Sequence, residues 1–208
     1  MANSSELRAR ARETLRGKWT EPVLLMLVYG VVLTVLGFIE NIPLVGWVAS
    51  LLVTGPLMLG LYGYFLDLVR ERGPSIAGLF SGFSRFPEAF LLNLLVGIFT
   101  VLWMLLLVIP GIIAAIRYSQ AFFILRDNPG IGGLEAIRRS KAMMNGNKGR
   151  YFVFVLSYLG WIILGIIPFG IGMLWVGPYM YTGFAHFYEE LNRAAYTEPP
   201  IQPGLNFQ

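Results

Sequence analysis

The sequence predicts an all-α, polytopic membrane protein, and three observations point to this fold class. Hydrophobic residues make up 56% of the 208 residues and charged residues only 13%, whereas soluble domains carry about 25% charged residues. Six apolar stretches can be read, and several of them approach or exceed the ~20 residues that cross a bilayer as a helix. The basic residues fall almost entirely between alternate stretches. The composition excludes a disordered chain, a disulfide scaffold and an ordinary soluble enzyme domain.

The six apolar stretches form three pairs, and each pair is predicted to be a helical hairpin. They cover residues 22–39, 42–69, 89–109, 112–125, 151–167 and 169–188. Transmembrane β-strands would be about 10 residues long with alternating polarity, so these longer runs favour helices. The stretch 112–125 is short, and it fits a tilted span, a re-entrant segment or a helix that continues past Leu125. The first stretch lacks a cleavage pattern, which favours an uncleaved span over a signal peptide.

The pairs also indicate an internal repeat. Each pair is joined by an Ile-Pro dipeptide, at Ile42-Pro43, Ile109-Pro110 and Ile167-Pro168. We therefore predict one transmembrane domain over residues 1–196, made of repeat units at about 5–72, 74–127 and 129–192. Coincidence among abundant Gly, Pro and Leu is the alternative. Residues 197–208 contain three prolines and are predicted to form a flexible C-terminal tail.

Each unit begins with a predicted amphipathic helix on the cytoplasmic side. The first opens with Asn3-Ser-Ser-Glu6, which resembles a capping box, and continues with an apolar stripe at Leu7, Ala11 and Leu15. In the second, apolar residues share one α-helical face after an expected cap at Ser75; they are Ile76, Leu79, Phe80, Phe83 and Phe86. In the third, Asn128 is expected to cap a helix that begins at Pro129.

Basic residues set the predicted orientation. The chain has 16 Lys and Arg, and all except Arg117 lie outside the apolar stretches on the same predicted side. Loop Lys and Arg mark the cytoplasmic side, so both termini are expected there. The candidate residues for binding anionic lipid headgroups or a partner are Arg138, Arg139, Lys141 and Lys148. The alternative is that these bases only anchor the topology. The net charge of +4 follows from this bias, so no nucleic acid is expected as a partner.

A second candidate site lies inside an apolar stretch, at Arg117, Tyr118, Ser119 and Gln120. A charge inside a span costs about 2.5–3.5 kcal/mol on insertion scales, more if it faces lipid. Arg117 therefore either faces the interior, where its polar neighbours complete an anion or headgroup site, or reaches outward to lipid phosphate or Glu40.

Catalytic and metal chemistry is not expected. The chain holds one histidine and no cysteine, too few ligands for a zinc-type site, and no cofactor is predicted. A hydrolase triad would have to use His186, with Asp67 and Glu189 as candidate neighbours, and nothing in the sequence fixes them beside it. The sequence therefore predicts that the protein is not an enzyme.

A series of ordered motifs resembles a known family. The motifs are LWMLLLVIPGII at 102–113, then YS at 118–119, DNP at 127–129, EAIRRSKAMMNGNK at 135–148, SYLGW at 157–161, GIG at 170–172, PY at 178–179 and FYE at 187–189. They resemble the prokaryotic membrane-protein family catalogued as domain of unknown function 975, over about residues 6–192. The resemblance implies a multi-helix protein of the prokaryotic inner (plasma) membrane, without assigned catalytic residues. The architecture is more distantly similar to the membrane domain attached to some glycerophosphodiester phosphodiesterases.

Together these patterns favour a non-enzymatic scaffold, assembly factor or lipid-interacting protein, with a homo-oligomer or a protein partner as further expectations. The alternative is a small-solute or lipid transporter with a polar site near Arg117. Pro56, Pro110 and Pro178 lie in apolar stretches and predict broken or kinked helices. Transporters build binding sites from such helices.

Overall fold

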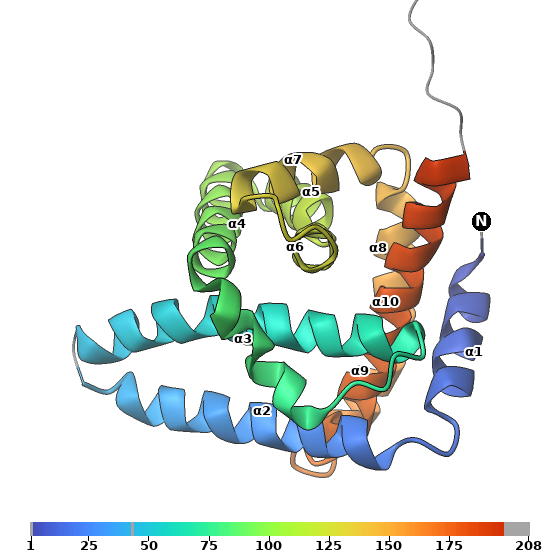
Figure 1. Ribbon diagram of the computed structural model, residues 1–208, viewed down its shortest axis with the longest axis horizontal. Helices are drawn as coiled ribbons and strands as arrows, with labels where there is room; N and C mark the ends of the chain where they lie inside the picture. The colour runs from blue at the N-terminus through green and yellow to red at the C-terminus, as the bar shows by residue number, and fades with distance from the viewer. Residues whose placement is uncertain (1, 43, 198–208) are drawn as a thin grey trace, which may run out of the picture.

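The computed structural model describes residues 2–42 and 44–197, and the regular structure of these residues is helical throughout (Figure 1). The helices are α1 (Ser4–Leu15), α2 (Thr20–Ile39), α3 (Val45–Val69), η1 (Ile76–Arg85), α4 (Phe86–Leu106), α5 (Val108–Tyr118), α6 (Ala121–Asp127), α7 (Gly133–Met143), α8 (Lys148–Leu156), α9 (Leu159–Ile166) and α10 (Met173–Thr197). The all-α prediction is confirmed. Pro43 and residues 198–208 of the predicted tail lie outside the described residues.

Five helical segments of the described chain are long and apolar enough to cross a membrane. They are Thr20–Ile39, Val45–Val69, Ile76–Leu106, Val108–Asp127 and Lys148–Ile166. The short predicted stretch 112–125 belongs to the fourth segment, in which α5 and α6 follow each other. The predicted sixth stretch, 169–188, falls on α10, which is not among the five. Tyr, Gly and His residues in α10 lower its hydropathy below that of the aliphatic helices.

The order of elements is repeat-like. Each short helix, α1, η1 or α7, precedes an apolar helix pair: α2 with α3, α4 with α5 and α6, or α8 and α9 with α10. We call α3, α6 and α10 the returning helices, because each follows the turn of its pair. Figure 1 shows the pairs pointing in different directions rather than forming one parallel bundle.

Helix interruptions lie at serines rather than at prolines. Pro56 and Pro178 lie inside the continuous helices α3 and α10, and Pro110 lies in the first turn of α5. Pro56 and Pro178 therefore do not break their helices, and the break near Pro110 lies three residues earlier, at Leu107. Ser119 separates α5 from α6, and Ser157 separates α8 from α9. Each hydroxyl donates to the carbonyl oxygen three residues earlier, at 2.9 Å and 2.6 Å, and such bonds compete with the helical ladder.

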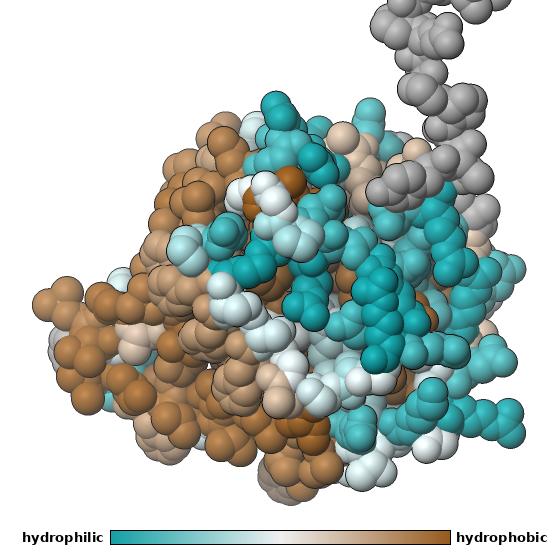
Figure 2. Space-filling view, viewed as in Figure 1, coloured by the Kyte–Doolittle hydropathy of each residue, from teal (hydrophilic) through white to brown (hydrophobic). Residues whose placement is uncertain are grey.

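The turns of the three pairs expose large apolar side chains. Leu44, Leu107 and Phe169 are 81%, 66% and 101% exposed. The turn of the second pair lies at Leu107, whose backbone is extended, so the predicted turn at Ile109-Pro110 is displaced by two residues. Pro110 belongs to α5 because a proline in the first helical turn gives up no hydrogen bond. In Figure 2 apolar surface covers the left and lower parts of the molecule, including the turn between α2 and α3.

Two glycines join η1 to α3 by direct backbone contact. A Cβ on Gly60 would lie 1.8 Å from the carbonyl oxygen of Leu79, and a Cβ on Gly82 would lie 1.9 Å from a carbonyl oxygen of α3. η1 is a 3₁₀-helix with three residues per turn, so Leu79 and Gly82 are buried while Phe80 and Phe83 are exposed. The predicted α-helical face of residues 76–86 is therefore wrong.

The predicted caps have different outcomes. The capping box of α1 is confirmed: Asn3 accepts from the Glu6 N–H at 2.9 Å, and the Glu6 carboxylate accepts from the Asn3 N–H at 3.0 Å. Asn128 does not cap α7, and Pro129 is not its first residue, because α7 begins at Gly133. The glycines between them disfavour an earlier helix start. Ser75 occupies the cap position of η1 without a side-chain hydrogen bond.

An aromatic core lies where the returning helices meet. The Tyr62 ring of α3 lies 4.7 Å from the Phe123 ring of α6 and 5.6 Å from the Tyr181 ring of α10, between ring centroids. Phe123 also stacks on Tyr188 at 5.2 Å. Phe65, Phe123 and Tyr188 are almost completely buried. This packing fixes the returning helices relative to one another and positions the charged residues at their polar ends.

Candidate functional site at the junction of the helix pairs

Each returning helix carries an acidic residue near its polar end: Asp67 in α3, Asp127 in α6 and Glu189 in α10. The aromatic core lies directly before these residues in each helix, so its packing brings the three carboxylates together. We call the residues Asp67, Arg70, Arg126, Asp127 and Glu189 the polar junction.

Arg70 links the three helix pairs. Its guanidinium donates from Nη2 to Asp127 Oδ2 at 2.7 Å, from Nη1 to the other oxygen of Asp127, and from Nε to Glu189 Oε1 at 2.6 Å. The Tyr188 hydroxyl donates to Asp127 Oδ2 at 3.0 Å. The side chains of Arg70, Asp127 and Glu189 are 16%, 19% and 12% exposed. One cation therefore neutralises carboxylates from two other helices in a largely buried place.

A second ion pair joins α3 and α6, with the arginine now on α6 and the carboxylate on α3. Arg126 of α6 donates from Nη2 to Asp67 Oδ2 of α3 at 3.0 Å, while α3 supplies Arg70 to Asp127 of α6. The two helices thus exchange arginine and carboxylate. Arg85 adds three bonds to backbone carbonyls in the last turn of α6 and just after it, the shortest at 2.5 Å to Leu125. A cation at this position also stabilises the negative end of the helix dipole.

Electrostatics hold the junction in its charged form. The hydrogen bonds to Asp127 raise the pKa of Arg70, burial opposes this effect, and the contacts with Glu189 add to the rise. Breaking a buried pair costs about 3–5 kcal/mol because it leaves an uncompensated charge. The junction is therefore suited to holding the pairs together, and its carboxylates are occupied by arginines rather than open to a ligand.

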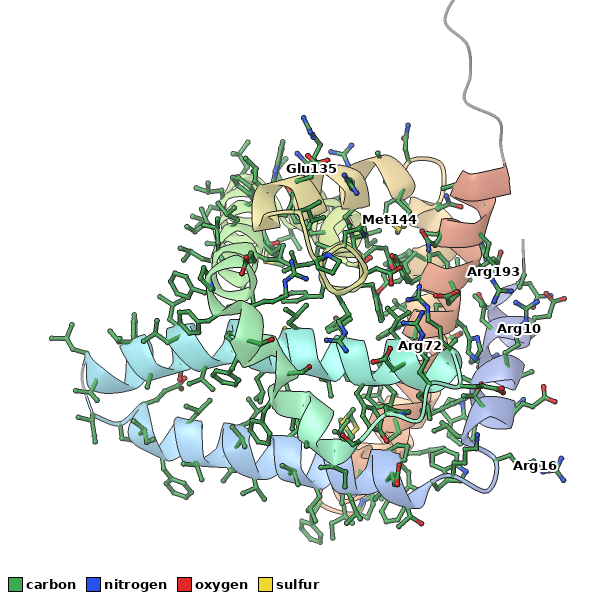
Figure 3. All side chains as sticks on the ribbon, in the orientation of Figure 1. Arg10, Arg16, Arg72, Glu135, Met144 and Arg193 are labelled. Atoms are coloured by element: carbon green, nitrogen blue, oxygen red, sulfur yellow. The ribbon has the colours of Figure 1, made fainter. Side chains whose placement is uncertain are left out.

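The first and last helices meet beside the junction. The apolar stripe of α1, Leu7, Ala11 and Leu15, is completely buried against α10. Glu190 of α10 accepts from the backbone N–H of Ala2 at 2.8 Å and from Arg150 at 2.6 Å. The predicted stripe therefore packs on protein rather than on lipid. Arg8 donates to the carbonyl oxygen of Ser157 at 2.9 Å, whereas Arg12 of α1 and Arg16 directly after it are exposed, as Figure 3 shows for Arg16.

His186 does not form a triad with Asp67 or Glu189 in this arrangement. Its Nε2 lies 2.8 Å from the Thr14 hydroxyl of α1. The two carboxylates bind Arg126 and Arg70 instead. The histidine contributes to the contact between α1 and α10.

The four predicted polar residues Arg117–Gln120 do not meet in one pocket, and hydrogen bonds join their backbone to α7. Ser140 of α7 donates to the carbonyl oxygen of Arg117 at 2.7 Å and accepts from the Gln120 N–H at 3.2 Å. Gln120 is completely buried and its Nε2 donates to Ser119 at 2.9 Å, while its Oε1 has no partner. Tyr118 is also buried. The Arg117 guanidinium is half-buried and makes no ion pair with a described residue.

The predicted basic residues of α7 lie at the surface. Arg138 and Arg139 have side chains that are 79% and 48% exposed, and both pair with Glu135. The bonds from Arg139 and Arg138 lower the pKa of Glu135. Lys141 lies 5.8 Å above the Tyr118 ring. Lys148, at the start of α8, is half-buried.

α7 lies across the polar ends of α4 and α5 (Figures 1 and 3). A Cβ on Gly133 would lie 2.7 Å from the backbone nitrogen of Leu92 in α4, so only glycine permits this approach. At its other end α7 bonds to α5 through Ser140. The helix therefore buries Ala136 and Ile137 and presents its bases outward.

The sequence patterns did not reveal the polar junction. Asp67 and Glu189 were expected only as candidate neighbours of His186, and Asp127 only as part of the DNP motif. Their pairing with Arg70 and Arg126 was not predicted. The available signal was the recurrence of an acid after the aromatic residues of each returning helix.

Comparison with known proteins gives one result. The model of a family described as "Protein of unknown function (DUF975)" matches residues 1–110 and 100–195. No curated protein and no solved structure matches the chain.

Proposed function

The chain belongs to the DUF975 family, whose description states no activity, and we propose from its structure that it is a non-enzymatic membrane protein that binds anionic lipid headgroups. The proposed contacts are the outward bases of α7, with those of α1 beside them. The proposed location is a prokaryotic inner (plasma) membrane, with both termini in the cytoplasm.

The observation that carries the proposal is the separation of exposed charge from exposed apolar surface. The turns of the helix pairs expose leucine, isoleucine and phenylalanine, while α1, α7 and the polar junction hold the arginines. Figure 2 shows hydrophilic surface gathered on the front and right of the molecule, away from the apolar left and lower parts. In water these apolar turns would be an aggregation hazard. In a bilayer the exposed apolar sides of the helices lie in hydrocarbon, their turns lie at the far surface, and the bases lie at the level of the headgroups.

We further propose six spans, with α10 as the sixth. The Ala2 N–H of the first helix bonds to Glu190 near the end of the last helix at 2.8 Å. The two ends of the described chain therefore lie on the same side of the molecule, which requires an even number of crossings. Five candidate segments together with α10 satisfy this requirement.

The absence of free catalytic groups at the junction supports a binding role over an enzymatic one. His186 is half-buried and lies 2.8 Å from the Thr14 hydroxyl, and the carboxylates Asp67, Asp127 and Glu189 are paired with arginines. The bases of α7 differ, because their only carboxylate partner among the described residues is the local Glu135. These bases can exchange that partner for a phosphate in a neighbouring headgroup.

Cysteine labelling tests the six-span proposal directly, because the native chain has no cysteine. Single cysteines at Leu44, Leu107 and Phe169 are expected to react with a membrane-impermeant maleimide on intact cells. Cysteines at Asn145 and Ala195 are expected to react only after permeabilisation. Reaction of Ala195→Cys on intact cells would instead indicate five spans and contradict the proposal.

Lipid enrichment in nanodiscs tests the headgroup proposal. The native chain is expected to retain phosphatidylglycerol in excess over phosphatidylcholine. The variant R138E/R139E/K141E is expected to reduce this excess about tenfold, since each base near the surface contributes about 1 kcal/mol. The matched variant Glu135→Gln frees Arg138 and Arg139 from their shared carboxylate and is expected to raise this excess. An unchanged excess in both variants would reject headgroup binding, and capture of a polypeptide by the native chain alone would assign α7 to a protein partner.

A further inference from the structure

An apolar groove runs along α4, between α3 and α5. The groove has a volume of about 740 Å³. It is lined mainly by aliphatic and aromatic side chains of these three helices, with Asn93, Thr100 and Ser119 as its polar members. A second hollow of about 770 Å³ lies toward the turn of the first pair and shares Leu51 and Asn93 with the first. The two hollows adjoin, and we call them together the α4 groove.

A glycine gives the groove its depth. Asn93, Gly97 and Thr100 follow one another at helical spacing along one face of α4 and all line the groove. A Cβ on Gly97 would meet no atom within 4 Å. The space in front of Gly97 is therefore open, unlike the space at Gly55 in α3, where a Cβ would lie 2.6 Å from the carbonyl oxygen of Ala89.

The groove also contains an unused polar group. Asn93 lies where the two hollows meet, and its side-chain amide makes no hydrogen bond to a described residue. Inside a bilayer an amide without a partner is costly, because hydrocarbon supplies neither donor nor acceptor. A lipid ester or hydroxyl at this position would satisfy it.

Positive charge lies at the polar end of the groove. Tyr118 lines the groove, and the Lys141 ammonium lies 5.8 Å from the centre of its ring. Lys141 forms no ion pair with a described carboxylate. It differs in this respect from Arg138 and Arg139, which share Glu135. The groove thus combines an apolar channel, a central amide and an unneutralised cation at one end.

We propose that the α4 groove binds one anionic phospholipid, with an acyl chain along Gly97 and the headgroup phosphate at Lys141. A neutral lipid would leave the Lys141 ammonium uncompensated, and a free anion would leave the apolar lining unfilled. Each of the two hollows of the groove, about 740 and 770 Å³, falls in the range of small-molecule sites, about 300–1,000 Å³. The assignment rests on the proposed function, because a bilayer lipid reaches the groove only if these helices span the membrane.

Native mass spectrometry of the full chain, released from nanodiscs that contain phosphatidylglycerol and phosphatidylcholine, tests the site. The native chain is expected to retain one phosphatidylglycerol. Gly97→Phe, which fills the groove without a backbone clash, is expected to reduce retention about tenfold. Gly37→Phe is the matched control: Gly37 lies in α2, outside the groove, and a Cβ there also meets no atom within 4 Å. This control is expected to keep the lipid.

The variant Lys141→Gln tests the headgroup contact separately from the acyl-chain contact. It is expected to reduce the preference for phosphatidylglycerol over phosphatidylcholine while total lipid retention persists. Equal retention by Gly97→Phe and Gly37→Phe, or retention of several lipids without headgroup preference, would overturn the groove assignment. Gly97→Leu, a smaller change, gives the same test if the phenylalanine variant does not fold. Cysteine labelling reads the topology independently, so a failure of the spanning proposal is distinguished from a failure of this site.

Discussion

The polar junction and α7 use the same chemistry in opposite surroundings. In the junction, Arg70 is 16% exposed in its side chain and binds carboxylates 57 and 119 residues away in sequence. On α7, Arg138 is 79% exposed and binds Glu135 three residues away. The first kind of pair closes the fold, because it joins different helix pairs. The second kind contributes little to folding and leaves the base accessible to other anions.

This contrast teaches that burial and sequence separation, rather than residue type, assign a role to each arginine. A buried arginine cannot change its partner without a penalty of several kcal/mol. An exposed one exchanges a carboxylate for water or phosphate at almost no cost. Pairs of arginine and carboxylate therefore hold the helix pairs together in the polar junction and form the candidate binding surface on α7.

Removing Arg70, the central cation of the polar junction, should have the largest effect on stability. Arg70→Met leaves Asp127 and Glu189 without their main partner and is expected to lower the free energy of unfolding by about 3 kcal/mol. Arg138→Met, the matched change on α7, is expected to cost less than about 0.5 kcal/mol. Denaturant unfolding in detergent, followed by tryptophan fluorescence, measures both. Equal losses in the two variants would contradict the separation of roles.

A double-mutant cycle sharpens the comparison at the second junction pair. We expect Asp67→Asn and Arg126→Gln to couple by about 1–2 kcal/mol in the free energy of unfolding, since the two side chains bind across helices. The reference cycle, Glu135→Gln with Arg139→Gln, is expected to couple by about 0.3–0.5 kcal/mol, as exposed pairs at this helical spacing do. A coupling in the reference cycle as large as that at the junction would reject the comparison.

The fold class was predictable because apolar runs and basic loops are written directly in the sequence. The capping box at Asn3 and Glu6 was predictable for the same reason, since it depends on neighbouring residues. The 3₁₀ geometry of η1 was not, because it depends on Gly60 and Gly82 meeting a neighbouring backbone. The late start of α7 at Gly133 likewise reflects its fit against Leu92.

The candidate site shows the same limit. Arg138, Arg139 and Lys141 were recognisable from local amphipathicity, whereas the pairing of Arg70 with Asp127 and Glu189 depends on three helices that meet only in the folded chain. No local spacing encodes those contacts. The α4 groove is also a tertiary feature, formed because Gly97 faces the space between α3 and α5.

The packing of α1 against α10 has a consequence for the chain while it is being synthesised. The ribosome makes Leu7, Ala11 and Leu15 first and their partner helix last, after an interval of about 10–40 s at 5–20 residues per second. Throughout that interval the apolar stripe of α1 has no protein to pack on. The Ala2–Glu190 bond forms only when α10 arrives, so a chain stalled before α10 carries an open stripe at its beginning. The exposed apolar stripe of α1 therefore identifies an unfinished chain to quality-control factors.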